Sequence, residues 1–181
     1  MEIVIETKRL LLRQFAEEDA EALCAVCNQD DILRWMPDWK GTVEQKREWI
    51  RWVDGQYANA NRNTARVILA VTLPRHKAFI GVVGIGNKPE VDNEIEIAYF
   101  VSREYRNQGY ITEAANALIT WAFQTLKIDS LMAIVEPENL PSQRVVEKCG
   151  FTRCETRMIL NAGETEAKPF YYYRFCHPEK C

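Results

Sequence analysis

A strand that runs into a glycine-containing loop and then a helix is the feature that most limits the folds open to this chain. Residues 93–102, NEIEIAYFVS, place Glu94 and Glu96 on one face of a strand. After the loop EYRNQG, apolar residues recur at the spacing of one helix face, namely Ile111, Ala115, Leu118, Ala122 and Leu126. Gly109 allows a tight turn and leaves the unpaired amides of the first helical turn open to a ligand. Such a helix start binds phosphate, but an ordinary strand-to-helix turn gives the same pattern.

The remaining segments predict a mixed α/β domain. Strand-like patterns cover residues 3–15, 64–74, 77–87, 93–102, 130–135, 151–160 and 170–176. Helix-like patterns cover residues 16–27, 42–59, 110–126 and 141–150, and Thr42 with Gln45 forms a capping-box pattern. Residues 28–41 form a loop or a broken short helix, because Pro37 and Gly41 interrupt them. The order β-α-α-β-β-β-α-β-α-β-β predicts a central, partly antiparallel sheet.

Composition narrows the classes of protein further. We expect one domain over residues 1–181, because a chain of 181 residues is large enough for a single core. Its net charge of −3 and the lack of a basic run argue against a nucleic-acid partner. No long apolar run predicts a membrane span, and no export signal is visible, so we expect a cytoplasmic protein with reduced cysteines. Cys24, Cys27, Cys176 and Cys181 could supply zinc ligands, but packing of the helical Cys24 is the simpler interpretation, and we expect no metal.

Two motifs resemble those of the GNAT superfamily of N-acetyltransferases. REYRNQGYITEAANALITWAF is similar to the acyl-CoA-binding motif [RQ]-x-x-G-x-[GA], with matches at Arg106 and Gly109, although Ile111 stands where a small residue is usual. NLPSQRVVEKCGF is similar to the second signature, N-x-x-S-x-x-x-x-x-K-x-G-F, at Asn139, Ser142, Lys148, Gly150 and Phe151. ETKRLLLRQFAEEDAEAL and NEIEIAYFVSREYRNQGY further resemble the branch that includes ribosomal-protein N-terminal (alanine or serine) acetyltransferases. The likeness runs from about residue 5 to 175.

This resemblance implies a fold and a cofactor. The fold is a mostly antiparallel sheet of six to seven strands, splayed between the fourth and fifth strands and flanked by about four helices. The cofactor is acetyl-CoA, with its pantetheine arm in the opening. The implied cofactor-binding residues are Phe100, Val101, Arg106, Asn107, Gln108, Gly109, Tyr110, Ile111, Thr112, Asn139, Ser142 and Lys148. Asn139 is equally a turn residue before a helix, and Lys148 is equally a solvated helix residue.

Acetyl transfer to an amine needs a base and a group that assists the departing thiolate. Glu96 is the predicted base, because a carboxylate in a strand beside the opening has its pKa raised by burial; the alternative is a solvent-facing edge charge. Many relatives place a tyrosine where this chain has Val146. Ser142, one turn earlier on the same helix, is the predicted substitute that orients or relays a proton, and otherwise it is a first-turn serine.

The aromatic segment between the first two helices predicts the acceptor site. Our hypothesis is that Trp35, Met36 and Trp39 line an amine pocket, although core packing under a loop is the simpler explanation for these side chains. The resemblance implies direct acetyl transfer in a ternary complex to a primary amine, first a protein N-terminal amine of the ribosomal-protein type. A polyamine, an amino acid or an aminoglycoside remains an alternative acceptor, and a catalytically silent acyl-CoA sensor is an alternative function. A homodimer is also compatible with the sequence, because exposed strand edges and helices that contain tryptophan often pair between protomers.

Overall fold

The computed structural model describes residues 2–76 and 78–176, and these residues contain one mixed sheet. Its eight strands follow the order β1-β2-β3-β4-β5-β6-β8-β7. All neighbouring pairs are antiparallel except β5 and β6, which are parallel. The strands are β1 (Val4–Glu6), β2 (Leu11–Arg13), β3 (Val67–Leu73), β4 (Ala78–Lys88), β5 (Glu94–Val101), β6 (Ser130–Val135), β7 (Thr152–Ile159) and β8 (Lys168–Cys176).

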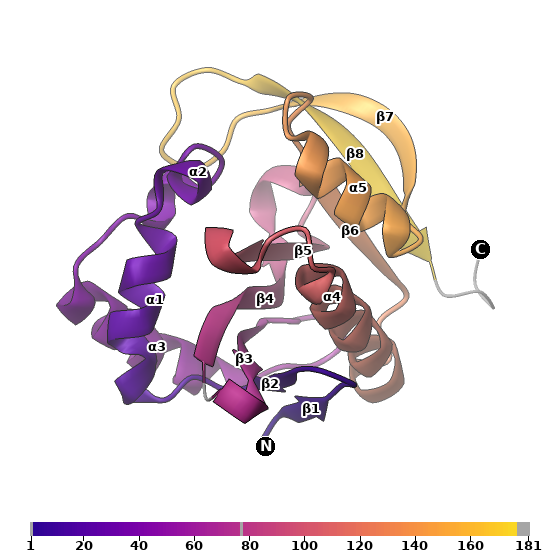
Figure 1. The fold of residues 1–181 in the computed structure, drawn as a ribbon. Coiled ribbons are helices and arrows are strands. Elements are labelled where there is room, and N and C mark those ends of the chain that lie inside the picture. Colours follow the sequence, from indigo (N-terminus) through magenta and orange to yellow (C-terminus); the bar gives the residue numbers. More distant parts are fainter. Residues whose placement is uncertain (1, 77, 177–181) are drawn as a thin grey trace.

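Helices cover both faces of this sheet. They are α1 (Ala20–Cys27), α2 (Asp30–Leu33), α3 (Val43–Tyr57), α4 (Tyr110–Trp121) and α5 (Leu140–Lys148). Figure 1 shows α1 and α3 on one side of the central strands and α4 on the other, with α5 beside β6 and β8. The main core fills both layers, and its members on α4 and β4 are fully buried, as at Leu118 and Val83.

The predicted fold class is confirmed, and most predicted elements are present. The capping box at the start of α3 forms, since Thr42 Oγ1 accepts from the Gln45 amide at 3.3 Å and the Thr42 amide donates to Gln45 Oε1 at 2.8 Å. The first predicted strand is divided into β1 and β2, which raises the strand count to eight. The division follows from a tight turn in which Thr7 N donates to Leu10 O at 2.9 Å and Leu10 N donates to Thr7 Oγ1 at 2.8 Å.

Strands β5 and β6 part as the resemblance implies. β4 and β5 pair along their whole length, from Lys88↔Glu94 to Gly81↔Val101. In contrast, β5 and β6 share a single register position, Glu96↔Met132. Beyond Glu96 the two strands therefore diverge, and an opening forms between β5 and the end of the sheet that carries β6, β8 and β7.

Two further expectations bear on the part of the chain that the structure describes. None of its helices is long and apolar enough to cross a membrane. Across residues 2–76 and 78–176, no three His, Cys, Asp or Glu side chains gather as ligands for a metal ion. Cys181, one of the four considered zinc ligands, lies outside the described residues.

Candidate active site

The loop before α4 has the backbone shape expected of an anion cradle. Gly109 adopts a left-handed conformation with φ of 76°, and Asn107 is also left-handed at 58°. Gly109 occupies the N-cap position, and no side chain caps this helix. The amides of Tyr110, Ile111 and Thr112 begin a helix of 12 residues, so its partly positive end faces outward without a capping oxygen. These residues fit a diphosphate group.

Arg9, which the sequence reasoning missed, braces this loop from the turn between β1 and β2. Its Nη1 donates to the Gln108 carbonyl at 2.9 Å, and its Nε donates to Glu113 Oε2 at 2.7 Å. Its guanidinium also lies 4.4 Å from the centre of the Tyr110 ring. Arg9 therefore fixes the residues on both sides of Gly109, and it adds positive charge next to the helix N-terminus.

The two arginines of the loop share one carboxylate. Arg103 Nη2 lies 3.1 Å from Asp31 Oδ1, and Arg106 Nη1 pairs with the other oxygen of the same side chain. Gln29 joins this group, because its side chain accepts from the Arg103 amide at 2.9 Å and donates to Ser102 Oγ at 3.0 Å. The loop is thus linked directly to α2, and part of the positive charge expected from Arg106 is already paired.

Phe100 and Val101 lie at the far end of β5, in the part that has separated from β6. Gly81 of β4 approaches this backbone so closely that a Cβ would collide with the Phe100 carbonyl oxygen and lie 2.9 Å from Val101 Cα. Any larger residue at Gly81 would push β5 out of place. The amides of Phe100 and Val101 remain the predicted oxyanion donors, and Gly81 is a further residue on which their position depends.

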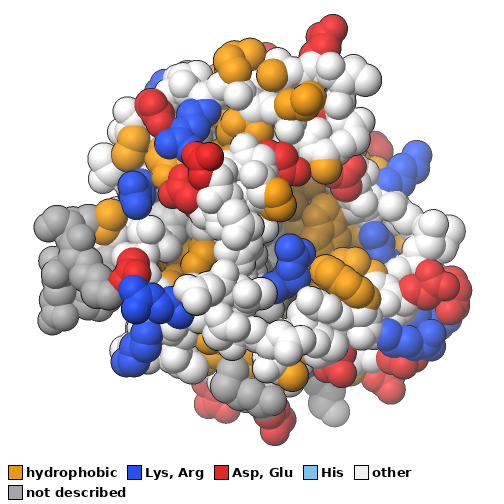
Figure 2. Space-filling model, turned by 180° about the vertical axis from the view of Figure 1, so that it is seen from behind, with side chains coloured by type: hydrophobic (Ala, Val, Ile, Leu, Met, Phe, Trp, Pro, Cys, Tyr) orange, Lys and Arg blue, Asp and Glu red, His pale blue; other side chains and the backbone are white. Residues whose placement is uncertain are grey.

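A cavity of about 200 Å³ opens on the β3–β4–β5 face beside the point where β5 leaves β6. Few side-chain atoms fill the floor of this cavity, because Gly84, Gly86 and Ala98 lie on this face. Figure 2 shows a hollow on this side of the molecule with hydrophobic side chains inside it and both basic and acidic side chains around it. The cavity therefore exists because three neighbouring positions of β4 and β5 have small residues.

Glu96 projects into this cavity, and its environment differs from that of Glu94. Its side chain is 21% exposed, and its Oε2 lies 3.9 Å from Lys88 Nζ. Burial raises the pKa of Glu96 to about 7, although Lys88 acts in the opposite direction and Glu90 adds to the rise. Glu94 instead accepts hydrogen bonds from the Tyr172 hydroxyl at 2.8 and 3.0 Å, outside the cavity. Of the two strand carboxylates, only Glu96 is placed to accept a proton from a ligand in the cavity.

The acceptor-side segment contributes two of its three predicted residues to the cavity wall. Met36 and Trp39 line the cavity, whereas Trp35 does not and instead has the Arg34 guanidinium over its ring at 4.5 Å. The centre of the Trp39 ring also lies 4.8 Å from the centre of the Phe100 ring, so Trp39 both lines the cavity and packs against the core. Arg34, which follows α2, has its Nη2 3.1 Å from Glu138 Oε2, so this segment reaches the turn before α5.

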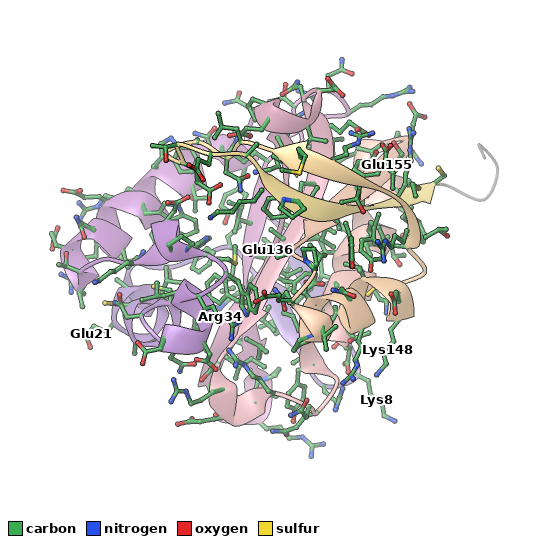
Figure 3. The ribbon with its side chains drawn as sticks, turned by 90° about the horizontal axis from the view of Figure 1, so that it is seen from above. Lys8, Glu21, Arg34, Glu136, Lys148 and Glu155 are labelled. Carbon is green, nitrogen blue, oxygen red and sulfur yellow. The ribbon has the colours of Figure 1, made fainter. Side chains whose placement is uncertain are left out.

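The second signature begins at the N-terminus of α5. Asn139 caps this helix, since its Oδ1 accepts from the Ser142 amide at 3.2 Å. Ser142 Oγ lies 3.1 Å from the hydroxyl of Tyr99 on β5. Lys148, at the other end of α5, is exposed on the outside of the molecule (Figure 3). Val146 is buried in the core, so the helix offers no acidic side chain at that position.

Comparisons with known proteins agree with this geometry. Residues 9–152 match the family model described as an acetyltransferase (GNAT) domain. The chain belongs to the GNAT acetyltransferase family. The uncharacterized N-acetyltransferase YnaD of Bacillus subtilis is 28% identical over 149 residues, which cover 82% of each chain. A GNAT-family acetyltransferase from Bacillus anthracis has a TM-score of 0.80 and 27% identity, covering 96% of this chain and 98% of that one. A proposed ribosomal-protein-serine acetyltransferase from Vibrio cholerae has a TM-score of 0.77 and 25% identity, covering 97% and 98%.

GNAT membership makes this protein an N-acetyltransferase. Among more distant solved neighbours, the ribosomal L7/L12 α-N-protein acetyltransferase RimL in complex with coenzyme A has a TM-score of 0.78 at 15% identity, which supports the fold alone. Within the GNAT fold, the structure brings Glu96, Met36 and Trp39 to one cavity, and it places Gly109 and Ser142 on elements that border the β5–β6 opening. The individual roles of these residues stay predictions.

Proposed function

We propose that this protein transfers the acetyl group of acetyl-CoA directly to the N-terminal amine of a protein, within a ternary complex. The uncapped start of α4, the left-handed Gly109 and the parted strands β5 and β6 fit the cofactor. The main-chain amides from Arg106 to Thr112 would hold the diphosphate, and Asn139 would hold the pantetheine arm. Acetyl-CoA supplies an activated acetyl group as a thioester.

The observation that carries the proposal is the partly buried Glu96 in a cavity that opens to solvent beside the parted strands. An acceptor amine enters from the side of Met36 and Trp39 and loses a proton to Glu96, directly or through one water molecule. The amides near Phe100 and Val101 stabilise the negative charge that develops on the acetyl oxygen. No covalent intermediate on the protein is needed, because both reactants reach the same point from opposite sides of the opening.

The basicity of Glu96 favours an α-amine, such as a protein N-terminus, over a lysine-like amine. An α-amino group has a pKa of about 7.7–8.0, whereas a lysine-like amine has one of about 10.4. A carboxylate with a pKa of about 7 can therefore accept a proton from an α-ammonium group at little cost. A polyamine would remain charged, and its deprotonation by the same carboxylate would be much less favourable. The similarity to a proposed ribosomal-protein-serine acetyltransferase supports the same acceptor class.

A small amine is the second candidate, and the size of the cavity is the observation in its favour. A volume of about 200 Å³ is below the usual range for ligand pockets and would hold an acceptor of amino-acid size. The same volume would also hold the first residue of a peptide whose remainder lies outside. The two candidates therefore differ in whether contacts beyond the first residue increase the rate.

The test measures release of the coenzyme A thiol with two matched acceptor series. One series contains peptides with a free N-terminus of Ser, Ala or Met, and the other contains the corresponding single amino acids, polyamines and an aminoglycoside. We expect kcat/KM to rise with peptide length and to vanish when the N-terminus is formylated. Double-reciprocal plots should intersect, as direct transfer in a ternary complex requires. Equal rates for amino acids and peptides would support the small-amine alternative, and acetyl-CoA binding without turnover on any amine would overturn the enzymatic proposal.

A further inference from the structure

Tyr99 makes the polar contact that spans the opening between β5 and α5. Its hydroxyl lies 3.1 Å from both Ser142 Oγ and the Ser142 carbonyl oxygen, so its single proton can be donated to either oxygen. Tyr99 belongs to the separated part of β5, three residues after Glu96, and Ser142 belongs to the first turn of α5. The contact therefore lies where the resemblance would place the thioester end of the cofactor.

Tyr99 and Glu96 project from opposite faces of the same strand. Side chains alternate along a strand, so residues three apart point to opposite faces and their Cα atoms are separated by about 10 Å. Glu96 lines the acceptor cavity with Ala98 and Phe100. Tyr99 also borders this cavity, but its hydroxyl reaches the helix on the other face. The proton of the amine is therefore taken up on one face of β5, and the sulfur departs on the other face.

The position of α5 at which relatives have a tyrosine supplies no hydrogen-bond donor for the thiolate in this chain. Val146, in the position where relatives have a tyrosine, is an apolar residue that is only 1% exposed. A lone serine hydroxyl rotates freely and is a weak acid, so it assists a leaving group well only when another group fixes its direction. Tyr99 supplies this second group from a different element.

We propose that Tyr99 is a positioning residue whose hydroxyl donates its proton to Ser142 Oγ, so that the serine hydroxyl in turn donates a hydrogen bond to the departing thiolate of coenzyme A. The proposal rests on the cofactor placement described under the proposed function, but not on the identity of the acceptor. In the reaction the amine nitrogen bonds to the acetyl carbon, the carbon–sulfur bond breaks, and its electron pair stays on sulfur. The amine enters this step neutral, because Glu96 has already passed the ammonium proton to solvent. Glu96 then takes the second proton from nitrogen, and the thiolate leaves as an anion or takes a proton from solvent.

Full proton transfer from Ser142 is not required by this scheme. A thiol has a pKa of about 8.5, so a thiolate that accepts a hydrogen bond is stable enough to leave near neutral pH. Burial raises the pKa of the Tyr99 phenol, which therefore stays neutral and keeps its donor proton. The neighbouring titratable groups, the Cys149 thiol and the Tyr173 phenol, also have pKa values raised by burial and carry no charge near neutral pH.

The first experiment compares Tyr99→Phe with the wild-type protein on leaving groups of different acidity. With acetyl-CoA, kcat should fall about 10- to 100-fold while KM for acetyl-CoA stays within twofold, because one hydrogen bond to a developing charge is lost. With an acetyl ester of a nitro-substituted thiophenol, whose thiolate needs no assistance, the loss in kcat/KM should be below twofold. Ser142→Ala should show the same pattern, and the double variant should lose little more than either single variant.

Tyr173→Phe is the matched control. Tyr173 is fully buried on β8, and its hydroxyl donates to Glu147 Oε1 at 3.3 Å, so this variant removes the hydroxyl of a nearby buried tyrosine that bonds to Glu147 and not to Ser142. It should leave kcat unchanged with both acetyl donors. A Tyr99→Phe variant that lost activity equally with both donors, or only through a higher KM, would show a structural role and would overturn the proposal.

The second experiment needs only coenzyme A and no acceptor. The ultraviolet absorbance of the thiolate gives the pKa of the bound thiol, with desulfo-coenzyme A as the blank. We expect this pKa to be lowered on binding by ~1 unit, since a hydrogen bond favours the charged form, and to return towards its free value in Tyr99→Phe and Ser142→Ala but not in Tyr173→Phe. An unchanged titration in Tyr99→Phe would overturn the proposal even if the protein proved to acetylate a different class of amine.

Discussion

Lys88 Nζ lies 3.9 Å from Glu96 Oε2 and 3.7 Å from Glu90 Oε2, so one ammonium group of β4 faces two carboxylates of the acceptor cavity. Lys88 lowers the pKa of Glu96 and so opposes the larger effect of burial. The position of the rising limb in a pH–rate profile, which reports the ionisation of Glu96, should therefore depend on Lys88.

We predict that Lys88→Met raises the pKa of Glu96 and moves the rising limb of kcat/KM to higher pH. Removal of a nearby positive charge disfavours the ionised carboxylate, and only that form accepts a proton. The profile is measured from pH 5 to 9 with acetyl-CoA held at saturation. Lys168→Met is the control, because Lys168 Nζ pairs with Glu164 at 2.7 Å. A shift to lower pH in Lys88→Met would contradict the assignment of Glu96 as the base.

Glu96→Gln should lower kcat about 10²- to 10⁴-fold at pH 7, the range usual for loss of a general base. Affinity for coenzyme A should change little, since Glu96 faces the acceptor cavity on the opposite side of β5 from Tyr99. Stopped-assay turnover and calorimetry with coenzyme A measure the two quantities separately. Unchanged turnover would remove Glu96 from the mechanism, and Glu94→Gln serves as the comparison because Glu94 is engaged by Tyr172.

Local sequence patterns were enough to predict most of the scaffold. The capping box of Thr42 and Gln45 needs only residues three apart, and the alternation in residues 94–101 marks a strand with two distinct faces. Gly109 could be assigned a left-handed turn because glycine tolerates positive φ and a helix pattern follows directly. These features depend on residues that are close together in the sequence, so they can be predicted without a structure.

The missed features depend on residues far apart in the chain. Arg9 reaches Gln108 across 99 residues, and Arg106 pairs with Asp31 across 75. The close approach of Gly81 to Phe100 follows from the register of β4 against β5, which a single sequence does not specify. Gly84 and Gly86 leave the floor of the cavity empty, and this role also depends on which strands lie beside them.

This cavity floor yields a prediction about the acceptor. Gly86 has room for a side chain, since the nearest atom to an added Cβ would be the Ala65 carbonyl oxygen at 3.9 Å. We predict that Gly86→Val occupies part of the cavity and raises KM for the acceptor about 10-fold or more, a cost of about 1.4 kcal/mol or above, while leaving KM for acetyl-CoA within twofold. Initial-rate kinetics with each substrate varied in turn provide the measurement.

The control for that variant is Gly55→Ala on α3, where no atom lies within 4 Å of an added Cβ. This change should leave both KM values alone and stabilise the protein by roughly 0.5–1 kcal/mol, because glycine is unfavourable inside a helix. An acceptor KM that stayed unchanged in Gly86→Val would show that the amine enters by another route.

The raised pKa of Glu96 also predicts how stability depends on pH. The pKa rises from 4.5 in the unfolded chain to about 7 in the folded protein, so between these values the folded state binds the additional proton. The free energy of unfolding contributed by this group is therefore fully present below pH 4.5 and is lost as the pH rises through 7. The loss reaches about 3 kcal/mol, since each unit of pKa shift corresponds to about 1.4 kcal/mol. Glu96→Gln keeps a neutral side chain at all pH values, so its unfolding free energy, measured in urea at pH 5 and pH 8, should exceed that of the wild type by more at pH 8. An equal difference at both pH values would mean that Glu96 is ionised in the folded protein throughout this range, and the basis for its selectivity towards α-amines would be lost.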